Sequence, residues 1–129
     1  MNIDQLYDNQ LNFINTHQKI SVDERLKYLK KLKNEININE ENIYNALDLD
    51  LSKPRFETYA TEIGFLINEI DLFIRKLKSW AKPHNVTPAL MNFPSKDYII
   101  YEPYGKVLVI SPWNYPFQLA LLPAMSAFA

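Results

Sequence analysis

The prolines of this 129-residue chain are unevenly distributed, and their positions limit which segments can be helical. Pro54 alone precedes residue 82, whereas the other seven lie between Pro83 and Pro123. Because proline lacks a backbone N–H and fixes φ, it disfavours helix interiors and central strands. The sequence therefore predicts a helical segment over residues 1–82, a hairpin or extended segment over 83–104, and a strand, turn and helix over 105–129.

Apolar residues recur every three or four positions throughout the first segment, which is typical of amphipathic helices. We expect the first helix over residues 3–16, followed by a connection. Ser21 and Glu24 form an S-x-x-E capping box, which predicts the start of a second helix. After a third helix, Ser52 and Pro54 are interpreted as the N-cap and first-turn proline of a longer fourth helix.

The last third of the chain reads as extended structure followed by one helix. Pro-Ser-Lys-Asp, at residues 94–97, separates two short apolar stretches and predicts a β-hairpin. The apolar run GKVLVI, at residues 105–110, predicts a strand that is covered on both faces. A helix is expected from Pro116, with a kink at Pro123. Strand, turn and helix form the first half of a βαβ unit, so the predicted class is α/β.

Composition excludes several kinds of site and partner. The formal net charge of -1 gives no basic excess for nucleic acid, and no apolar run reaches the ~20 residues that span a bilayer. With no signal peptide at its start, the chain is expected in the cytoplasm. It contains no cysteine and only two glycines, which excludes thiol chemistry and glycine-rich phosphate loops within it. His17 and His84 are far apart, so no metal site is expected.

The turn Ser-Pro-Trp-Asn-Tyr-Pro, at residues 111–116, places one amide side chain, Asn114, between two prolines. Ligands bind at the carboxyl ends of parallel strands, and an amide held rigidly there can stabilise a developing oxyanion. The alternative is that Asn114 caps the following helix, while Trp113 and Tyr115 pack in the core. From the residues alone the cap is favoured, because Asn is common at helix starts.

The segment YEPYGKVLVISPWNYPFQLALLPAMSAFA closely resembles the aldehyde dehydrogenase family, and the wider pattern resembles its class 3 branch. ERLKYLKKLKNEI, IRKLKSWAKP and NFPSKDYIIYEP support the resemblance by their order and spacing. It implies N-terminal helices and a β-hairpin that lead into the first strand and helix of a truncated, Rossmann-like cofactor domain. It also implies NAD(P)-dependent oxidation of apolar or aromatic aldehydes to carboxylic acids, by a parent enzyme that is a homodimer.

The resemblance also implies roles for individual residues. Asn114 matches the asparagine whose amide completes the oxyanion hole. The positions expected to line the nicotinamide–ribose side of the NAD or NADP cleft are Ile110, Ser111, Pro112 and Trp113. Tyr115 and Phe65 match substrate-tunnel positions, and Phe65 lacks the hydroxyl of the tyrosine often found there.

Several parts of the family pattern are missing from these 129 residues. They include the Lys-Pro-Ser motif, the glycine-rich cofactor segment, the general-base glutamate and the cysteine nucleophile. The chain alone is therefore expected to be inactive, and a non-catalytic helical interaction module or an inactive remnant are the alternatives. Glu57 and Glu62 are interpreted as solvated or ion-paired surface residues, and His84 as an exposed linker residue.

Overall fold

The computed structural model describes residues 2–16 and 20–129. Part of the predicted connection after the first helix, including His17, lies outside the described residues. The elements, in chain order, are α1 (Ile3–Thr16), α2 (Val22–Ile38), α3 (Glu40–Leu51), α4 (Arg55–Thr58), the π-helical turn η1 (Tyr59–Ile63), α5 (Gly64–Trp80), β1 (His84–Val86), the 3-10 turn η2 (Leu90–Asn92), β2 (Asp97–Ile99) and α6 (Pro116–Phe128).

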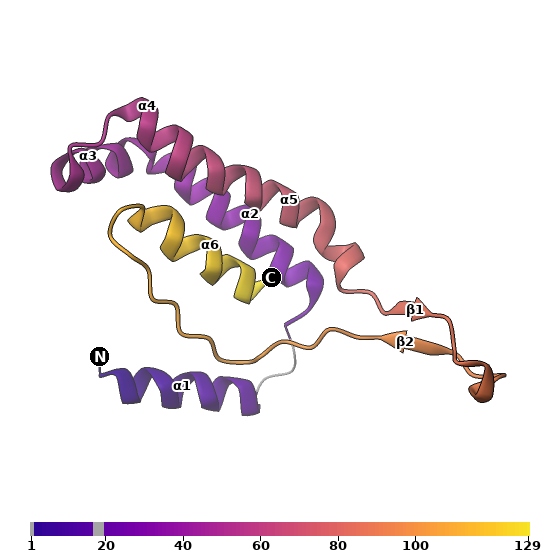
Figure 1. Ribbon diagram of the computed structural model, residues 1–129. Coiled ribbons are helices and arrows are strands. Elements are labelled where there is room, and N and C mark those ends of the chain that lie inside the picture. Colours follow the sequence, from indigo (N-terminus) through magenta and orange to yellow (C-terminus); the bar gives the residue numbers. More distant parts are fainter. Residues whose placement is uncertain (1, 17–19) are drawn as a thin grey trace.

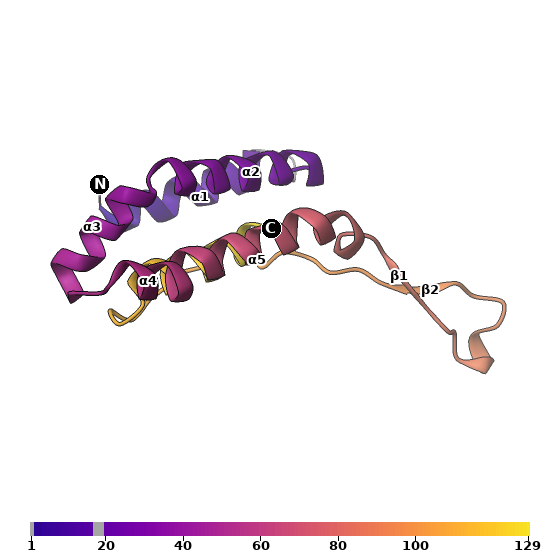
Figure 2. The same cartoon turned by 90° about the horizontal axis from the view of Figure 1, so that it is seen from above.

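Three helices, α2, α5 and α6, lie side by side and enclose the hydrophobic core (Figures 1 and 2). Each contributes one apolar stripe, as expected for helices that are packed on one face only. Leu29, Leu66 and Ile70 are essentially inaccessible to solvent. The remaining buried apolar residues of this cluster are Leu26, Ile36, Tyr44, Ile63, Leu77 and Met125.

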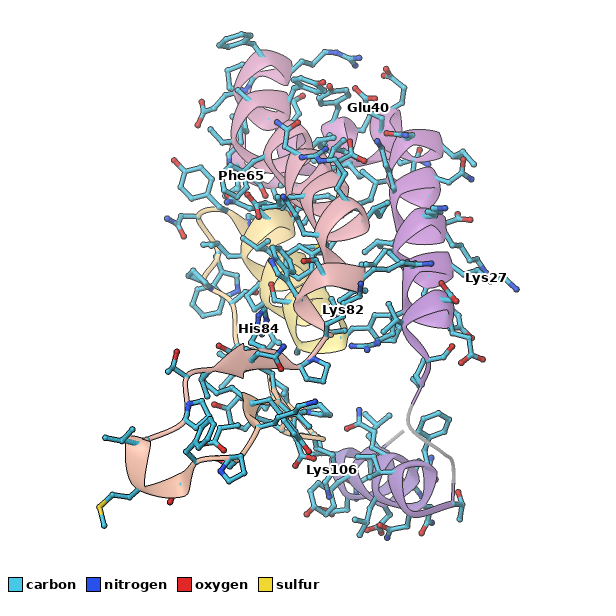
Figure 3. The ribbon with its side chains drawn as sticks, turned by 90° about the vertical axis from the view of Figure 1, so that its right-hand side faces the viewer. Lys27, Glu40, Phe65, Lys82, His84 and Lys106 are labelled. Atoms are coloured by element: carbon cyan, nitrogen blue, oxygen red, sulfur yellow. The ribbon has the colours of Figure 1, made fainter. Side chains whose placement is uncertain are left out.

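Helix α1 lies apart from the α2–α5–α6 layer in Figure 1, and none of its residues is buried. It contacts the extended chain that follows the hairpin. The ammonium group of Lys106 lies 3.4 Å from the centroid of the Tyr7 ring, and Figure 3 shows Lys106 beside α1. A cation over an aromatic face contributes a modest attraction at an exposed site.

The start of α2 confirms the predicted capping box. The Ser21 hydroxyl accepts a hydrogen bond from the backbone N–H of Glu24 at 3.2 Å. In return, a carboxylate oxygen of Glu24 accepts hydrogen bonds from the Ser21 hydroxyl at 2.8 Å and from its N–H at 3.1 Å. These bonds occupy donors that a helix start otherwise leaves free.

The predicted roles of Ser52 and Pro54 are wrong. Ser52 adopts the left-handed conformation, with φ of 50°, and ends α3 by donating its N–H to the carbonyl of Asp48. Pro54 occupies the N-cap position of α4 and makes no side-chain capping bond. The predicted long fourth helix is present as α4, η1 and α5, and it ends at Trp80, before Pro83.

A hairpin is present and projects away from the helices in Figures 1 and 2, but its first strand is β1, whereas the apolar stretch before Pro94 holds the 3-10 turn η2 and no strand. Its strands β1 and β2 are antiparallel, with His84 opposite Ile99 and Val86 opposite Asp97. His84 therefore lies in a strand rather than in a linker, although it is exposed as expected. Its ring packs edge-on against Tyr101, with 6.0 Å between the centroids.

Residues 105–110 were predicted to form a strand, but the structure assigns them no strand. A β-strand is defined by backbone hydrogen bonds to a neighbouring strand. No described residue forms such bonds with residues 105–110. Leu108 and Ile110 are consequently 83% and 85% exposed. The helix after it begins at Pro116 as predicted, and α6 continues past Pro123 to Phe128.

No helix in the described parts of the chain is both long enough and apolar enough to cross a membrane.

Candidate active site

The turn before α6 presents the side chain of Asn114 at the surface. Asn114 is exposed, and its amide group makes no hydrogen bond with any described residue. The N-cap position of α6 belongs to Tyr115, and no side chain there caps the helix. The interpretation of Asn114 as the helix cap is therefore wrong, and its amide remains available to a ligand.

The cap of α6 comes instead from Glu62, which is 55 residues away in sequence. One carboxylate oxygen of Glu62, Oε2, accepts hydrogen bonds from the N–H groups of Phe117 at 2.8 Å and Gln118 at 3.2 Å. Pro116 has no N–H, and the N–H of Leu119 bonds to the carbonyl of Tyr115 within the helix. Glu62 thus satisfies the free donors of the first turn and places negative charge at the positive end of the helix dipole.

Glu62 is completely buried, and the π-helical turn η1 places it there. The N–H of Gly64 bonds to the carbonyl of Tyr59, five residues back, so this turn holds one residue more than an α-helical turn. A Cβ atom on Gly64 would lie 2.9 Å from that same carbonyl oxygen. Glycine at position 64 therefore permits the close approach that the wide turn requires.

Lys53 lies against Glu62 and is also buried, at 7% exposure. Its ammonium group donates to Oε1 of Glu62 at 2.5 Å and to the backbone carbonyl of Asn114 at 2.9 Å. The ammonium nitrogen also lies 4.3 Å from the centroid of the Tyr115 ring. An ammonium group has three N–H donors, and these contacts give it partners on the carboxylate, the carbonyl and the ring face.

A second group of polar contacts joins α3 to α4, on either side of the connection that carries Lys53. Arg55 forms a two-pronged salt bridge with Glu41, with N–O distances of 2.6 and 2.7 Å. The guanidinium carbon of Arg55 lies 4.1 Å from the centroid of the Tyr44 ring. The pKa of Tyr44 is raised to about 12, mainly because its hydroxyl is buried and secondly because it donates a 2.6 Å hydrogen bond to Glu40. Tyr44 therefore keeps a neutral, donating hydroxyl at ordinary pH.

Sequence reasoning missed both Lys53 and Glu62. The interpretation of Glu62 as a solvated or surface ion-paired residue is wrong, whereas Glu57 is exposed as expected. The sequence does contain a signal that Glu62 is buried. Glu62 lies three residues after Tyr59 and four before Leu66, so helical spacing places it among the apolar residues of the predicted fourth helix. A single carboxylate in such a stripe needs a buried partner. Nothing comparable marks Lys53, which follows a serine in a connection between helices.

The other predicted site residues, except Phe65, lie in or just before the same turn. Ile110 and Trp113 are 85% and 87% exposed, Pro112 is exposed and Ser111 is half-buried. Tyr115 is half-buried beneath the Lys53 ammonium group. Phe65 is 41% exposed on α5, three residues after Glu62 (Figure 3). The structure thus brings Asn114 and Tyr115 together around Lys53 and leaves apolar side chains open beside them.

Within residues 2–16 and 20–129, no group of three acidic or histidine side chains is arranged to hold a metal ion.

The chain is similar in sequence to known proteins of one family. The model of the aldehyde dehydrogenase family matches residues 2–129. The chain is 44% identical over 127 residues to the 4,4'-diaponeurosporen-aldehyde dehydrogenase of Staphylococcus aureus, covering 98% of this chain and 28% of the relative. It is 43% identical over 108 residues to aldehyde dehydrogenase family 3 comG of Dictyostelium discoideum, covering 84% of this chain and 23% of the relative. The chain thus spans about a quarter of the length of the relatives it matches.

A solved structure is also similar, namely the substrate-bound state of Staphylococcus aureus AldH. The TM-score is 0.93 at 44% identity, over 99% of this chain and 28% of that one. The match confirms the predicted fold class, although only the hairpin strands are paired among the residues described here. Relatives from family 3 confirm the class 3 resemblance. On the match of its whole described length, the chain belongs to the aldehyde dehydrogenase family.

Proposed function

We propose that this chain forms part of an NAD(P)-dependent aldehyde dehydrogenase, in which the Asn114 side chain stabilises the oxyanion of the reacting aldehyde. The observation that carries the proposal is an exposed amide, free of hydrogen bonds to the described residues, on a turn whose backbone is held by buried charges. Such a donor is most effective when its direction is fixed before charge develops. The family membership of the chain supports this reaction.

In the proposed reaction, the role of this chain is to stabilise the oxyanion. The chain has no cysteine, so a cysteine nucleophile that attacks the aldehyde carbon would come from outside these 129 residues. As the carbonyl becomes tetrahedral, negative charge gathers on its oxygen, and an N–H of the Asn114 amide donates to it. When hydride then leaves the carbon, the oxygen returns to a carbonyl and the hydrogen bond weakens. Asn114 therefore binds the charged oxygen more strongly than the neutral one, which lowers the barrier.

The residues before α6 fit one part of a nicotinamide cofactor. NAD(P)⁺ supplies the hydride acceptor when it is bound. Its pyrophosphate has no site at the start of α6, because Glu62 already occupies the N–H groups of Phe117 and Gln118. The exposed apolar surface of Ile110, Pro112 and Trp113, with the polar Ser111, fits the nicotinamide–ribose side instead. These residues would hold that part of the cofactor.

We assign Tyr115 and Phe65 to the substrate side of the site. Both are aromatic and partly accessible, which suits apolar or aromatic aldehydes. Relatives named for 4,4'-diaponeurosporen-aldehyde and for 4,4'-diapolycopene-4,4'-dial support an aldehyde substrate. The proposed complete enzyme is a homodimer.

The test uses a complete enzyme that carries this chain. Residues 2–129 replace the matching segment of the Staphylococcus aureus relative, with which 127 residues align at 44% identity. Turnover of hexanal and benzaldehyde with NAD⁺ and NADP⁺ is followed by absorbance of the reduced cofactor. Asn114→Ala is expected to lower kcat by ~10²- to 10³-fold, as loss of one oxyanion donor does in other enzymes. Cofactor affinity, measured by fluorescence titration, should be retained.

Asn34→Ala is the matched control, because Asn34 is exposed on α2, a helix that carries no residue of the proposed site. Its kcat should equal that of the parent hybrid. Equal turnover by the Asn114→Ala and parent hybrids would remove the oxyanion role. A folded parent hybrid that oxidises neither aldehyde would contradict the proposed function as a whole.

A further inference from the structure

Lys53 and Glu62 are buried charges that take no part in the proposed reaction. They form an ion pair with 6% and 0% of their side chains exposed. Removing two charges from water costs about as much as their attraction returns, so a buried pair adds little net stability. Stability alone therefore does not explain this pair, and its other contacts indicate a different role.

Those other contacts lie on both sides of the residue pair Tyr115–Pro116. On one side, the ammonium group of Lys53 holds the carbonyl of Asn114 at 2.9 Å. On the other side, the carboxylate of Glu62 holds the N–H groups of Phe117 and Gln118. Because the two charges also bond to each other at 2.5 Å, a single buried unit fixes the backbone before and after the start of α6.

The Asn114 amide depends on this backbone for its direction. No hydrogen bond to a described residue orients the side chain, so its position follows from the path of the main chain at residue 114. A group that acts on a reacting atom must be held within roughly 0.5 Å of its productive position. A misplacement of ~1 Å can reduce rate by ~10²-fold.

We propose that Lys53 and Glu62 are positioning residues, which fix the turn before α6 and thereby aim the Asn114 amide. The inference rests on the proposed oxyanion role of Asn114. Lys53 acts mainly on Asn114, through its carbonyl, whereas Glu62 orients Lys53 and anchors the first turn of α6.

The experiment compares two variants in the hybrid enzyme described above. Lys53→Met removes the bond to the Asn114 carbonyl but leaves the Glu62 carboxylate buried without its cation. Because this variant can fail to fold, Lys53→Met/Glu62→Gln is made as well. In the double variant no charge is buried, and the glutamine carbonyl can still accept from the α6 N–H groups. The matched control is Lys33→Met, which breaks the partly exposed 2.7 Å pair with Asp71 between α2 and α5.

The double variant is expected to lower kcat for hexanal by ~10-fold or more, with a change in KM below about twofold, because orientation affects the reacting state more than binding. The same two substitutions made together with Asn114→Ala should lower kcat by less than about twofold further, since their target is already absent. Amide hydrogen exchange of a peptide covering residues 113–119 should be faster. Lys33→Met should change none of these quantities.

Equal losses of kcat in the Asn114 and Asn114→Ala backgrounds would overturn the positioning role, because they would show general damage to the fold. Unchanged turnover and unchanged exchange at residues 113–119 would overturn it as well. If Asn114→Ala itself leaves kcat unchanged, the proposed oxyanion role fails, whereas the exchange rates still decide whether the ion pair holds the turn. The two failures are therefore distinguishable.

Discussion

The starts of α2 and α6 solve the same problem in different ways. At α2 the free backbone donors are satisfied locally, by Ser21 and Glu24, which lie three residues apart and are exposed. At α6 they are satisfied by Glu62, a carboxylate 55 residues away and completely buried. A local cap stabilises one helix, whereas a distant cap also ties two helices together. The second arrangement is the one found beside the candidate site.

The two caps also differ in the consequences of losing them. Water can replace the Glu24 carboxylate, because the start of α2 is exposed. Water cannot readily reach the Glu62 site, where Lys53 would be left as a buried charge without its anionic partner. Substitutions at the two helix starts should therefore differ widely in cost.

The largest expected effect is that of Glu62→Ala. It removes the cap of α6 and leaves the Lys53 ammonium group buried with only a carbonyl and a ring as partners. We expect the free energy of unfolding to fall by about 3–5 kcal/mol, as for other broken buried pairs. Urea unfolding followed by circular dichroism measures it. A loss no greater than that of Ser21→Ala would abolish the distinction between the two caps.

Gly64→Ala should have the next largest effect. Alanine is normally the better helix former by up to ~1 kcal/mol, but here its Cβ would lie 2.9 Å from the backbone oxygen of Tyr59. The oxygen belongs to the main chain and cannot rotate away, so the clash outweighs the gain. A net loss of about 1–3 kcal/mol is expected by thermal unfolding. An increase in stability would show that η1 can relax without cost.

Ser21→Ala tests the local cap and should cost about 1 kcal/mol, which is typical for loss of an N-cap side chain. The variant loses the bond from the Glu24 N–H but exposes that donor to water. The same urea titration provides the value. Ser126→Ala serves as a control, because its hydroxyl only donates back to the carbonyl of Leu122 within α6. If Ser21→Ala lowered the free energy of unfolding by several kcal/mol, the local and the distant cap would not differ in their contribution to stability.

The smallest effect concerns the pH dependence of the α2 cap. Hydrogen bonds from the Ser21 side chain and backbone hold the pKa of Glu24 below its ordinary value of 4.5. The folded state thus favours ionised Glu24, which adds stability above the ordinary pKa and loses it as pH falls through the lowered one. The stability difference between the parent and Glu24→Gln should accordingly be largest near pH 7 and shrink below pH 4.5. If the stability difference between the parent and Glu24→Gln grew as the pH fell, the pKa of Glu24 would be raised rather than lowered by folding.

The contrast between the caps also explains what the sequence could predict. The span of the first helix, the Ser21–Glu24 box and the start of α6 follow from spacing within a few residues, and each was confirmed. The strand predicted at residues 105–110 was wrong because pairing depends on a neighbouring strand that no local pattern reveals.

The candidate site was predicted only in part, for the same reason. The turn around Asn114 was recognised from its prolines and from resemblance, and its proposed role stays a prediction. The groups that hold the turn were missed, because the contact of Glu62 with Phe117 joins residues 55 positions apart. The left-handed Ser52 likewise ends α3 through its backbone, and the Ser-Lys-Pro sequence at residues 52–54 does not predict that conformation.

The wide turn η1 also fixes the rotation of α4 about the helix axis relative to α5. Ala60 is exposed within η1, so deleting it would cut no buried side chain and would allow an ordinary helix to run from α4 into α5. Each residue turns a helix by ~100°, so α4 and Lys53 would swing by about that angle around the axis. The lysine would then face another side of the helix from Glu62. One additional residue in the backbone thus places the Lys53 ammonium group and the Glu62 carboxylate on the same side of the helix.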